Sequence, residues 1–150
     1  MEWGRLLFGF NGRTNRAKYW IAVLIYCAIY AVFAILGYAT DQNAIVQSVS
    51  GMIEIVMLVS SLAVGIKRLH DRDKSGWYLV LFYIGPGVLV VAGIVISFAF
   101  DDAMVAYVAL SIMASAIGVW AFIELGCLRG TVGSNQYGPD PIASALRSPV

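Results

Sequence analysis

Two acidic side chains lie inside apolar segments, where an unpaired charge is unfavourable. Glu54 is near the middle of the apolar run 44–66, and Glu124 is close to the end of the last such run. An ionisable group at the centre of a membrane helix costs about 2.5–3.5 kcal/mol on insertion scales, so Glu54 should have a polar neighbour or carry a proton. Such a group could handle protons or cations. Glu124 is close enough to a helix end to form an interfacial ion pair with Arg68 or Arg129.

A proline between two glycines interrupts another apolar run. Pro86 lies between Gly85 and Gly87 and has no N–H to donate to the carbonyl of Phe82 in a helix. The sequence therefore predicts a kink or break here, with polar backbone facing whatever lies beside it. Because Glu54 lies at a comparable depth in its own run, we expect it to face this break from inside a helix bundle.

The segment around His70 contains residue types of a general base and of a cation-binding loop. His70 precedes Asp71, and the pattern Asp71-x-Asp73-x-Ser75-Gly76 resembles the first half of a calcium-binding EF-hand loop. The twelfth loop position is Phe82 instead of glutamate, and His70 has no serine or cysteine in a nucleophile motif beside it. The sequence thus predicts no metal and no cofactor. The simpler interpretation is a polar loop in which the aspartates offset nearby positive charge.

Four apolar stretches are long enough to cross the hydrocarbon core of a bilayer, which requires about 20 helical residues. They cover residues 19–38, 44–66, 77–100 and 103–128. The chain is 60% hydrophobic and 13% charged, a composition that excludes an ordinary soluble domain. Because lipid cannot satisfy backbone N–H and C=O groups, the stretches should be helices. We predict an all-α, polytopic membrane protein with a four-helix transmembrane bundle, whose short connections at 39–43 and 101–102 make two tight hairpins.

All ten lysine and arginine residues fall on one side of these stretches. They are Arg5, Arg13, Arg16, Lys18, Lys67, Arg68, Arg72, Lys74, Arg129 and Arg147. By the positive-inside rule, this distribution predicts that both termini and the central loop are cytoplasmic. We expect the cytoplasmic segments to pack on one another, with Arg13 and Arg16 as charge partners of Asp71 and Asp73.

Both ends of the chain contain segments outside the four stretches. Apolar residues recur at helical spacing over 3–10 and predict a short interfacial helix before the first span. The glycine- and proline-rich segment 130–141 predicts a loop in which Asn135 and Tyr137 cap or bridge the ends of the spans. The last residues, 142–150, are expected to be a flexible tail.

Three polar segments together follow the pattern of a known family. They are FGFNGRTNRAKYW at 8–20, KRLHDRDKSGW at 67–77 and GTVGSNQYGPDP at 130–141. In this order among apolar spans, they resemble the signature stretches of the bacterial inner-membrane family called domain of unknown function 805. The resemblance covers essentially the whole chain and implies a multi-span protein of the bacterial inner membrane. It implies no particular activity, because that family has no established one.

Three classes of function remain open for what we predict to be a single membrane domain over residues 1–141. The first is an interaction or scaffold protein that presents cytoplasmic loops to a membrane-protein partner or to anionic lipid headgroups. The second is a small oligomeric transporter or channel that uses Glu54, and the third is a membrane enzyme that uses His70 and Asp71. Small residues in the second span suit close packing, including packing between copies in a homo-oligomer. Nucleic acid is not a predicted partner, because the basic residues form short clusters at helix ends.

Overall fold

The computed structural model describes residues 3–100 and 104–146, most of which are helical. The elements are α1 (Trp3–Phe8), α2 (Arg16–Ala39), α3 (Ala44–Asp71), α4 (Tyr78–Ala99), α5 (Met104–Phe122), the π-helix η1 (Ile123–Cys127) and α6 (Pro141–Leu146). In the described part of the chain, four helical segments are long and apolar enough to cross a membrane: α2, α3, α4, and α5 continued by η1. The predicted all-α class, with four spans after a short N-terminal helix, is confirmed.

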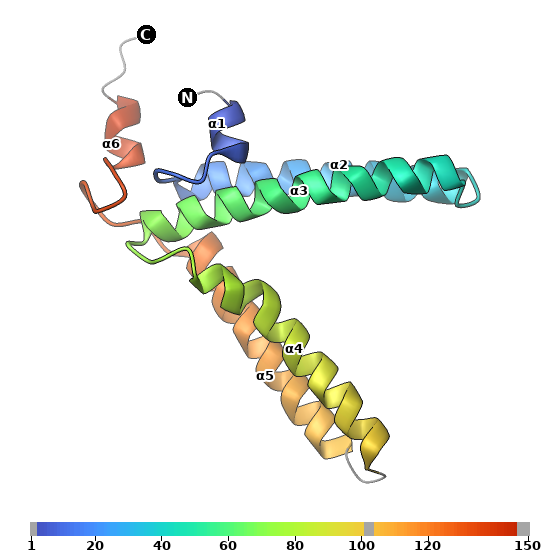
Figure 1. Ribbon diagram of the computed structural model, residues 1–150. Coiled ribbons are helices and arrows are strands. Elements are labelled where there is room, and N and C mark those ends of the chain that lie inside the picture. Colours follow the sequence, from blue (N-terminus) through green and yellow to red (C-terminus); the bar gives the residue numbers. More distant parts are fainter. Residues whose placement is uncertain (1–2, 101–103, 147–150) are drawn as a thin grey trace.

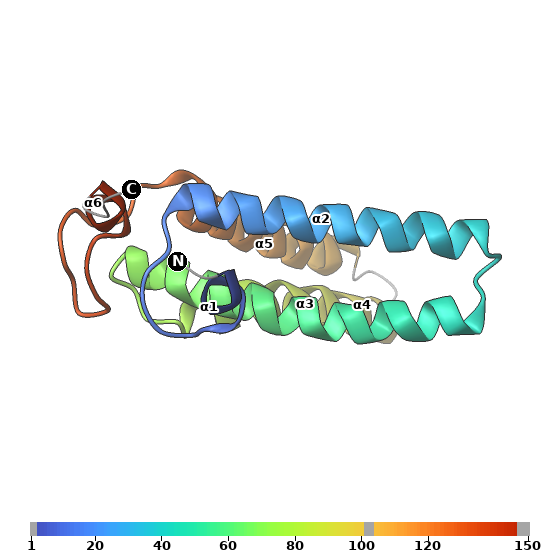
Figure 2. The ribbon, with the colours of Figure 1, turned by 90° about the horizontal axis from the view of Figure 1, so that it is seen from above.

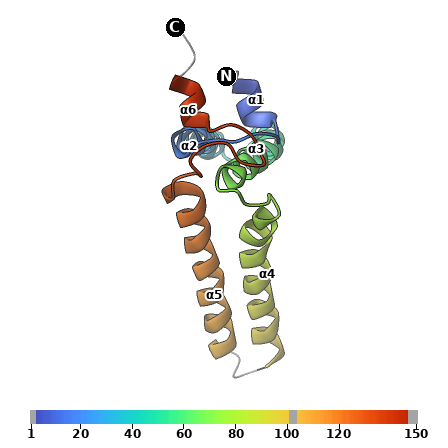
Figure 3. The same cartoon turned by 90° about the vertical axis from the view of Figure 1, so that its left-hand side faces the viewer.

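The four spans form two antiparallel hairpins that diverge from a shared end (Figure 1). α2 and α3 lie side by side in one hairpin (Figure 2). α4 and α5 lie side by side in the other (Figure 3). The main contacts between the hairpins are those of η1 with α2 and α3 and those of α4 with α3. The helices α1 and α6 also lie at the shared end, so the polar segments of the sequence gather there. The predicted turn at 101–102 lies outside the described residues.

Polar side chains and unusual backbone angles define both ends of the first hairpin. The side chain of Asn15 accepts a hydrogen bond of 2.9 Å from the backbone N–H of Lys18 and caps α2. Asn43 caps α3 in a similar way, because its side chain accepts a bond of 2.9 Å from the backbone N–H two residues later. Asp41 and Gln42 have φ angles of 48° and 59°, a left-handed conformation that reverses the chain within a few residues.

The third span is continuous through Pro86, so the predicted break does not occur. Pro86 lies inside α4, which runs without interruption from Tyr78 to Ala99. The missing N–H removes one bond of the helical ladder, at the carbonyl of Phe82. Phe82 is buried and packs edge-on against Trp120 of α5, with the ring centroids 5.1 Å apart. Proline is tolerated in membrane helices where neighbouring helices cover the freed backbone, and here α5 packs on this turn through Trp120.

A small hydrophobic core joins the hairpins at the shared end. Leu69 of α3, Leu79 and Phe82 of α4, and Leu125 of η1 form it. Gly65 lets α4 approach α3, because a Cβ at this position would lie 3.0 Å from the methyl carbons of Leu79. Beside this core, the angle between α3 and α4 holds an open apolar groove of about 630 Å³. Much of the surface of the spans is therefore available to lipid or to other chains.

The N-terminal helix α1 packs on α3 through a buried lysine. Lys67 is only 3% exposed, and its Nζ donates to the carbonyl of Arg5 at 2.7 Å and to that of Leu6. Ser60 adds a bond of 2.9 Å to the carbonyl of Leu7. These carbonyls lie at the C-terminal end of a helix, which favours a nearby cation, and that of Arg5 also accepts the backbone N–H of Gly9 at 3.2 Å. α1 is therefore bound to the second span, and its position at the membrane interface stays a prediction.

Replacing Lys67 by methionine should release α1 while leaving the hairpins folded. The methionine keeps the apolar stem and removes the charged donor, which contributes about 1.5–3 kcal/mol. We expect the backbone amides of residues 3–12 to exchange with deuterium about tenfold faster or more, as measured by mass spectrometry in detergent. Lys18→Met, a change of the same type outside α1 and α3, serves as control. Unchanged exchange over residues 3–12 in Lys67→Met would contradict this role.

Candidate functional site

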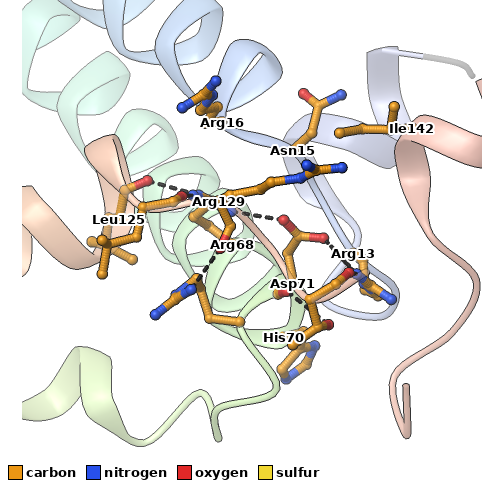
Figure 4. A network of polar contacts seen from close by, with 12 residues as sticks. Arg13, Asn15, Arg16, Arg68, His70, Asp71, Leu125, Arg129 and Ile142 are labelled. Atoms are coloured by element: carbon orange, nitrogen blue, oxygen red, sulfur yellow. Dashed lines mark hydrogen bonds and ion pairs between the residues drawn. The ribbon is translucent and has the colours of Figure 1, made fainter. Parts of the chain in front are cut away.

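Three charged side chains are buried together at the shared end of the hairpins. Arg13, Arg68 and Asp71 are 4%, 0% and 2% exposed, and we call them the arginine–aspartate network (Figure 4). Arg13 Nη2 lies 3.0 Å from Asp71 Oδ1, and Arg68 Nη1 lies 2.7 Å from Asp71 Oδ2. Each oxygen of the one carboxylate therefore receives a different guanidinium group. The predicted pairing of Arg13 with Asp71 is present.

Backbone carbonyls of the C-terminal half of the chain accept the other N–H groups of the two arginines. Arg13 donates to the carbonyl of Gly133 and to that of Thr131, each at 2.6 Å. Arg68 donates through Nε to the carbonyl of Leu125 at 2.7 Å, and through Nη2 to that of Leu128. Buried charges are tolerated when they are both paired and hydrogen-bonded. The network meets that condition and joins three segments that are distant in the sequence.

The C-terminal loop approaches Asp71 so closely that there is no room for a side chain at position 130. A Cβ on Gly130 would lie 1.9 Å from Asp71 Oδ2, far inside van der Waals contact. The next residue, Thr131, donates its backbone N–H to the carbonyl of Asp71 at 2.8 Å. On the other side, the backbone N–H of Thr14 donates to the carbonyl of Lys67 at 3.1 Å. Backbone contacts thus hold both loops against the end of α3.

The π-helical turn η1 ends the fourth span and exposes carbonyls to side chains of the first span. Terminal carbonyls of a helix have no helical donor and need other partners. Trp20 Nε1 donates to the carbonyl of Gly126 at 3.0 Å, and Arg16 Nη1 donates to that of Cys127 at 3.4 Å. A Cβ on Gly126 would lie 2.7 Å from the Trp20 ring. The glycine therefore lets the indole reach the backbone.

The buried Glu124 forms a second cluster with two partly exposed cations from the loop after α3. Arg72 Nε lies 3.1 Å from Glu124 Oε1, and Lys74 Nζ lies 3.0 Å from Oε2. The predicted partners, Arg68 and Arg129, were wrong. Arg68 is held in the arginine–aspartate network, and the turn after α3 brings Arg72 and Lys74 back to η1. An interfacial ion pair does exist, but the tertiary fold selects other cations for it.

His70 packs against the C-terminal loop at the edge of the network. Its ring stacks on that of Tyr137, with centroids 3.8 Å and planes 4° apart, and its Nδ1 lies 3.2 Å from the carbonyl oxygen of Gly12. Asn135 Nδ2 donates to the carbonyl of His70 at 2.8 Å. Asn135 and Tyr137 thus bridge the C-terminal loop to the end of α3. The contacts of His70 are those of a packing residue, and its use in an enzyme stays a prediction.

Arg16 and Asp73 do not make the predicted ion pairs with the network. Arg16 bonds to the carbonyl of Cys127, and Asp73 accepts a bond of 3.2 Å from Gln136. The φ angle of 57° at Asp73 places this residue in the turn that leaves α3. Asp71 is already satisfied by two guanidinium groups, so Arg16 keeps an exposed side chain.

Comparison with known proteins shows which family the sequence matches. Residues 7–139 match the family described as "Protein of unknown function (DUF805)". The chain belongs to the DUF805 family. Similar proteins of Escherichia coli strain K12 include inner membrane protein YhaI, which is 27% identical over 133 residues that cover 89% of this chain and 86% of YhaI. The uncharacterized protein YiiR is 29% identical, with coverages of 89% and 86%, and inner membrane protein YhaH is 27% identical, with coverages of 89% and 87%. No solved structure matches the chain.

The DUF805 match and the fold together establish where this chain resides. Two of the similar proteins are named inner membrane proteins, and the described part of the chain has four helices able to span a bilayer. This DUF805 chain is therefore a multi-pass inner-membrane protein. The matched range includes every residue of the arginine–aspartate network.

Glu54 of this DUF805 chain lies in a groove between α2 and α3, not beside Pro86. The groove has a volume of about 400 Å³, and its polar lining comes from Tyr26, Tyr30 and Ser61. An adjoining hollow that also reaches Glu54 is lined in part by Gln47 and Ser50. The expectation that Glu54 faces the third span from inside a helix bundle was wrong, because the hairpins diverge, α4 does not line this groove and Glu54 is exposed. Its polar neighbours come from the first hairpin, and its use in transport stays a prediction.

Several residues of the site could not be singled out from the sequence. They are Trp20, Lys67, Gly130 and Thr131. The density of glycine after the fourth span does signal close backbone approaches. Which side chain approaches, however, depends on contacts between residues far apart in the sequence, such as that of Gly130 with Asp71.

Proposed function

We propose that this DUF805 chain is a membrane scaffold that presents a rigid polar platform at the cytoplasmic face. The platform consists of the loop 9–15, the loop 72–77 and the segment 128–140. The observation that carries the proposal is the buried pairing of Arg13 and Arg68 with Asp71, which ties these segments together. Groups that are buried and fully bonded fix the positions of loops, and they are poorly placed to react with a substrate.

The cytoplasmic orientation of the platform is supported by the distribution of charge. All ten basic residues of the chain lie outside the apolar stretches 19–38, 44–66, 77–100 and 103–128, on the side that the positive-inside rule assigns to the cytoplasm. Reporter fusions at the N-terminus, after Arg72 and after Pro141 should read cytoplasmic, and an insertion at Asn43 should read external. A cytoplasmic reading at Asn43 would contradict this orientation.

The outer surface of the platform offers side chains for contact with a protein partner. Val132 is 76% exposed in the segment that Arg13 holds. A photo-cross-linking amino acid at Val132, introduced into the full chain in cells, should yield a discrete protein adduct that mass spectrometry identifies. The same probe at Tyr38, which is 87% exposed at the opposite end of the first hairpin, serves as control.

The scaffold proposal requires that the adduct be specific and depend on the platform. The adduct at Val132 should re-form with the purified partner and disappear when Asp71 is replaced by asparagine. If Val132 forms no protein adduct, or if Tyr38 forms the same one, the platform is not a docking surface.

A further inference from the structure

A small cavity with two exposed arginines lies beside the arginine–aspartate network. Its volume is about 170 Å³, and Asn15, Arg16 and Arg129 are among its lining residues. Figure 4 shows these residues on one side of the network, with Ile142 beside them. We propose that this cavity binds the phosphate group of an anionic phospholipid through the guanidinium groups of Arg16 and Arg129.

Most side-chain donors of the two cavity arginines have no other partner among the described residues. Arg129 makes no side-chain bond or ion pair within the part of the chain that the structure describes. Arg16 uses one N–H in a long bond of 3.4 Å to the carbonyl of Cys127. Arg13 and Arg68, in contrast, are buried and bonded to carbonyls and to Asp71. A guanidinium group presents a planar set of donors that matches phosphate oxygens.

The first turn of α2 adds to the attraction for an anion. Arg16 is the first residue of this 24-residue helix, and Asn15 is its N-cap. The cap accepts the N–H of Lys18, while the other N–H groups of the first turn have no helical acceptor. These groups and the positive end of the helix dipole favour a phosphate at this position.

The two carboxylates that line the cavity are already engaged by other groups. Asp71 lies between two guanidinium groups of the network. Asp140 accepts backbone N–H groups from Ile142 at 2.9 Å and from Gly133 at 3.2 Å. These bonds lower the pKa of Asp140, the bond from Ile142 having the largest effect. The cavity and the adjoining network together hold four guanidinium groups against two carboxylates, so the local charge stays positive.

The position of the cavity favours a lipid phosphate over a free anion. Arg16 begins a membrane-spanning helix, so the cavity should lie near the depth of lipid headgroups. Ile142 gives it an apolar edge, and exposed apolar residues of α2 such as Leu24, which is 65% exposed, continue into the hydrocarbon region. An acyl chain could follow this surface while the phosphate stays with the arginines.

The test is a titration of the purified full-length chain in neutral detergent with phosphatidylglycerol, followed by native mass spectrometry. A charge-assisted hydrogen bond contributes about 1.5 kcal/mol or more, so Arg16→Gln and Arg129→Gln should each weaken the first binding event about tenfold. The controls, Arg5→Gln and Lys18→Gln as separate variants, each remove one positive charge from a residue that does not line the cavity. The affinity of each control should change less than about threefold, because salt screens the interaction of the lipid phosphate with charges outside the cavity. Thermal melting of each variant verifies that it is folded.

Inorganic phosphate distinguishes the two possible sources of the ligand. If phosphatidylglycerol binds with the expected dependence on both arginines and millimolar phosphate does not displace it, the proposal is supported. If inorganic phosphate binds instead, with the same dependence, the site takes a free anion and the lipid assignment fails. If the control variants lose as much affinity as the cavity variants, the site is overturned. It is also overturned if the cavity variants are folded and lose no affinity. Because no partner protein is present, these outcomes do not depend on the scaffold proposal.

Discussion

Replacing Asp71 by asparagine is expected to lower the free energy of unfolding by about 3–5 kcal/mol. The carboxylate is 2% exposed and lies 3.0 Å from Arg13 and 2.7 Å from Arg68. Asparagine keeps the shape of the side chain and removes its charge, so two buried guanidinium groups would lose their only counterion in the network. The measurement is unfolding of the purified chain in detergent, by heat or by denaturant.

Asp73 provides the matched control for this change. Its carboxylate lies in the exposed turn after α3 and accepts one bond of 3.2 Å from Gln136. Asp73→Asn should therefore alter stability by less than about 1 kcal/mol, as exposed polar contacts do. The double variant Arg13→Met with Asp71→Asn should lose less free energy of unfolding than the sum of the two single variants. The reason is that Arg13→Met removes one of the charges that Asp71→Asn leaves unpaired. Additive losses would contradict the pairing.

Adding one methyl group at Gly130 is expected to destabilise the chain by about 3 kcal/mol. The new Cβ would lie 1.9 Å from Asp71 Oδ2, so the carboxylate or the loop must move. Movement of either would disrupt the contacts of Asp71 with Arg13 and Arg68, whose charges would then be buried without a partner. Gly130→Ala should therefore approach the effect of Asp71→Asn in the same unfolding experiment.

Gly118 is the control for the general effect of replacing glycine by alanine. It lies on the exposed surface of α5, and a Cβ there would meet nothing within 4 Å. Gly118→Ala should be neutral or stabilise the helix by up to about 1 kcal/mol. If Gly130→Ala proved as harmless as Gly118→Ala, the close approach of the C-terminal loop to Asp71 would be wrong.

The hydrophobic pattern does not predict where the helices begin and end. The first and second spans were predicted over 19–38 and 44–66, but α2 begins at Arg16 and α3 continues to Asp71. Apolar composition ends where charged residues begin, whereas the helices extend further because those charged groups form ion pairs or hydrogen bonds to backbone carbonyls in the folded chain. The flexibility of the tail 142–150 stays a prediction. Its residues up to Leu146 lie in α6, and 147–150 lie outside the described residues.

The sequence by itself determined the membrane class, the number of spans and the end at which polar segments gather. These properties depend on local composition, since an apolar run of sufficient length must form a helix in lipid whatever its neighbours are. The tertiary structure alone decided the partners of each charge: Arg13 and not Arg16 for Asp71, and Arg72 with Lys74 for Glu124. It also decided that Glu54 faces α2. Ion pairs and close packing act over a few ångströms, so they depend on how loops far apart in the sequence meet, which no local pattern records.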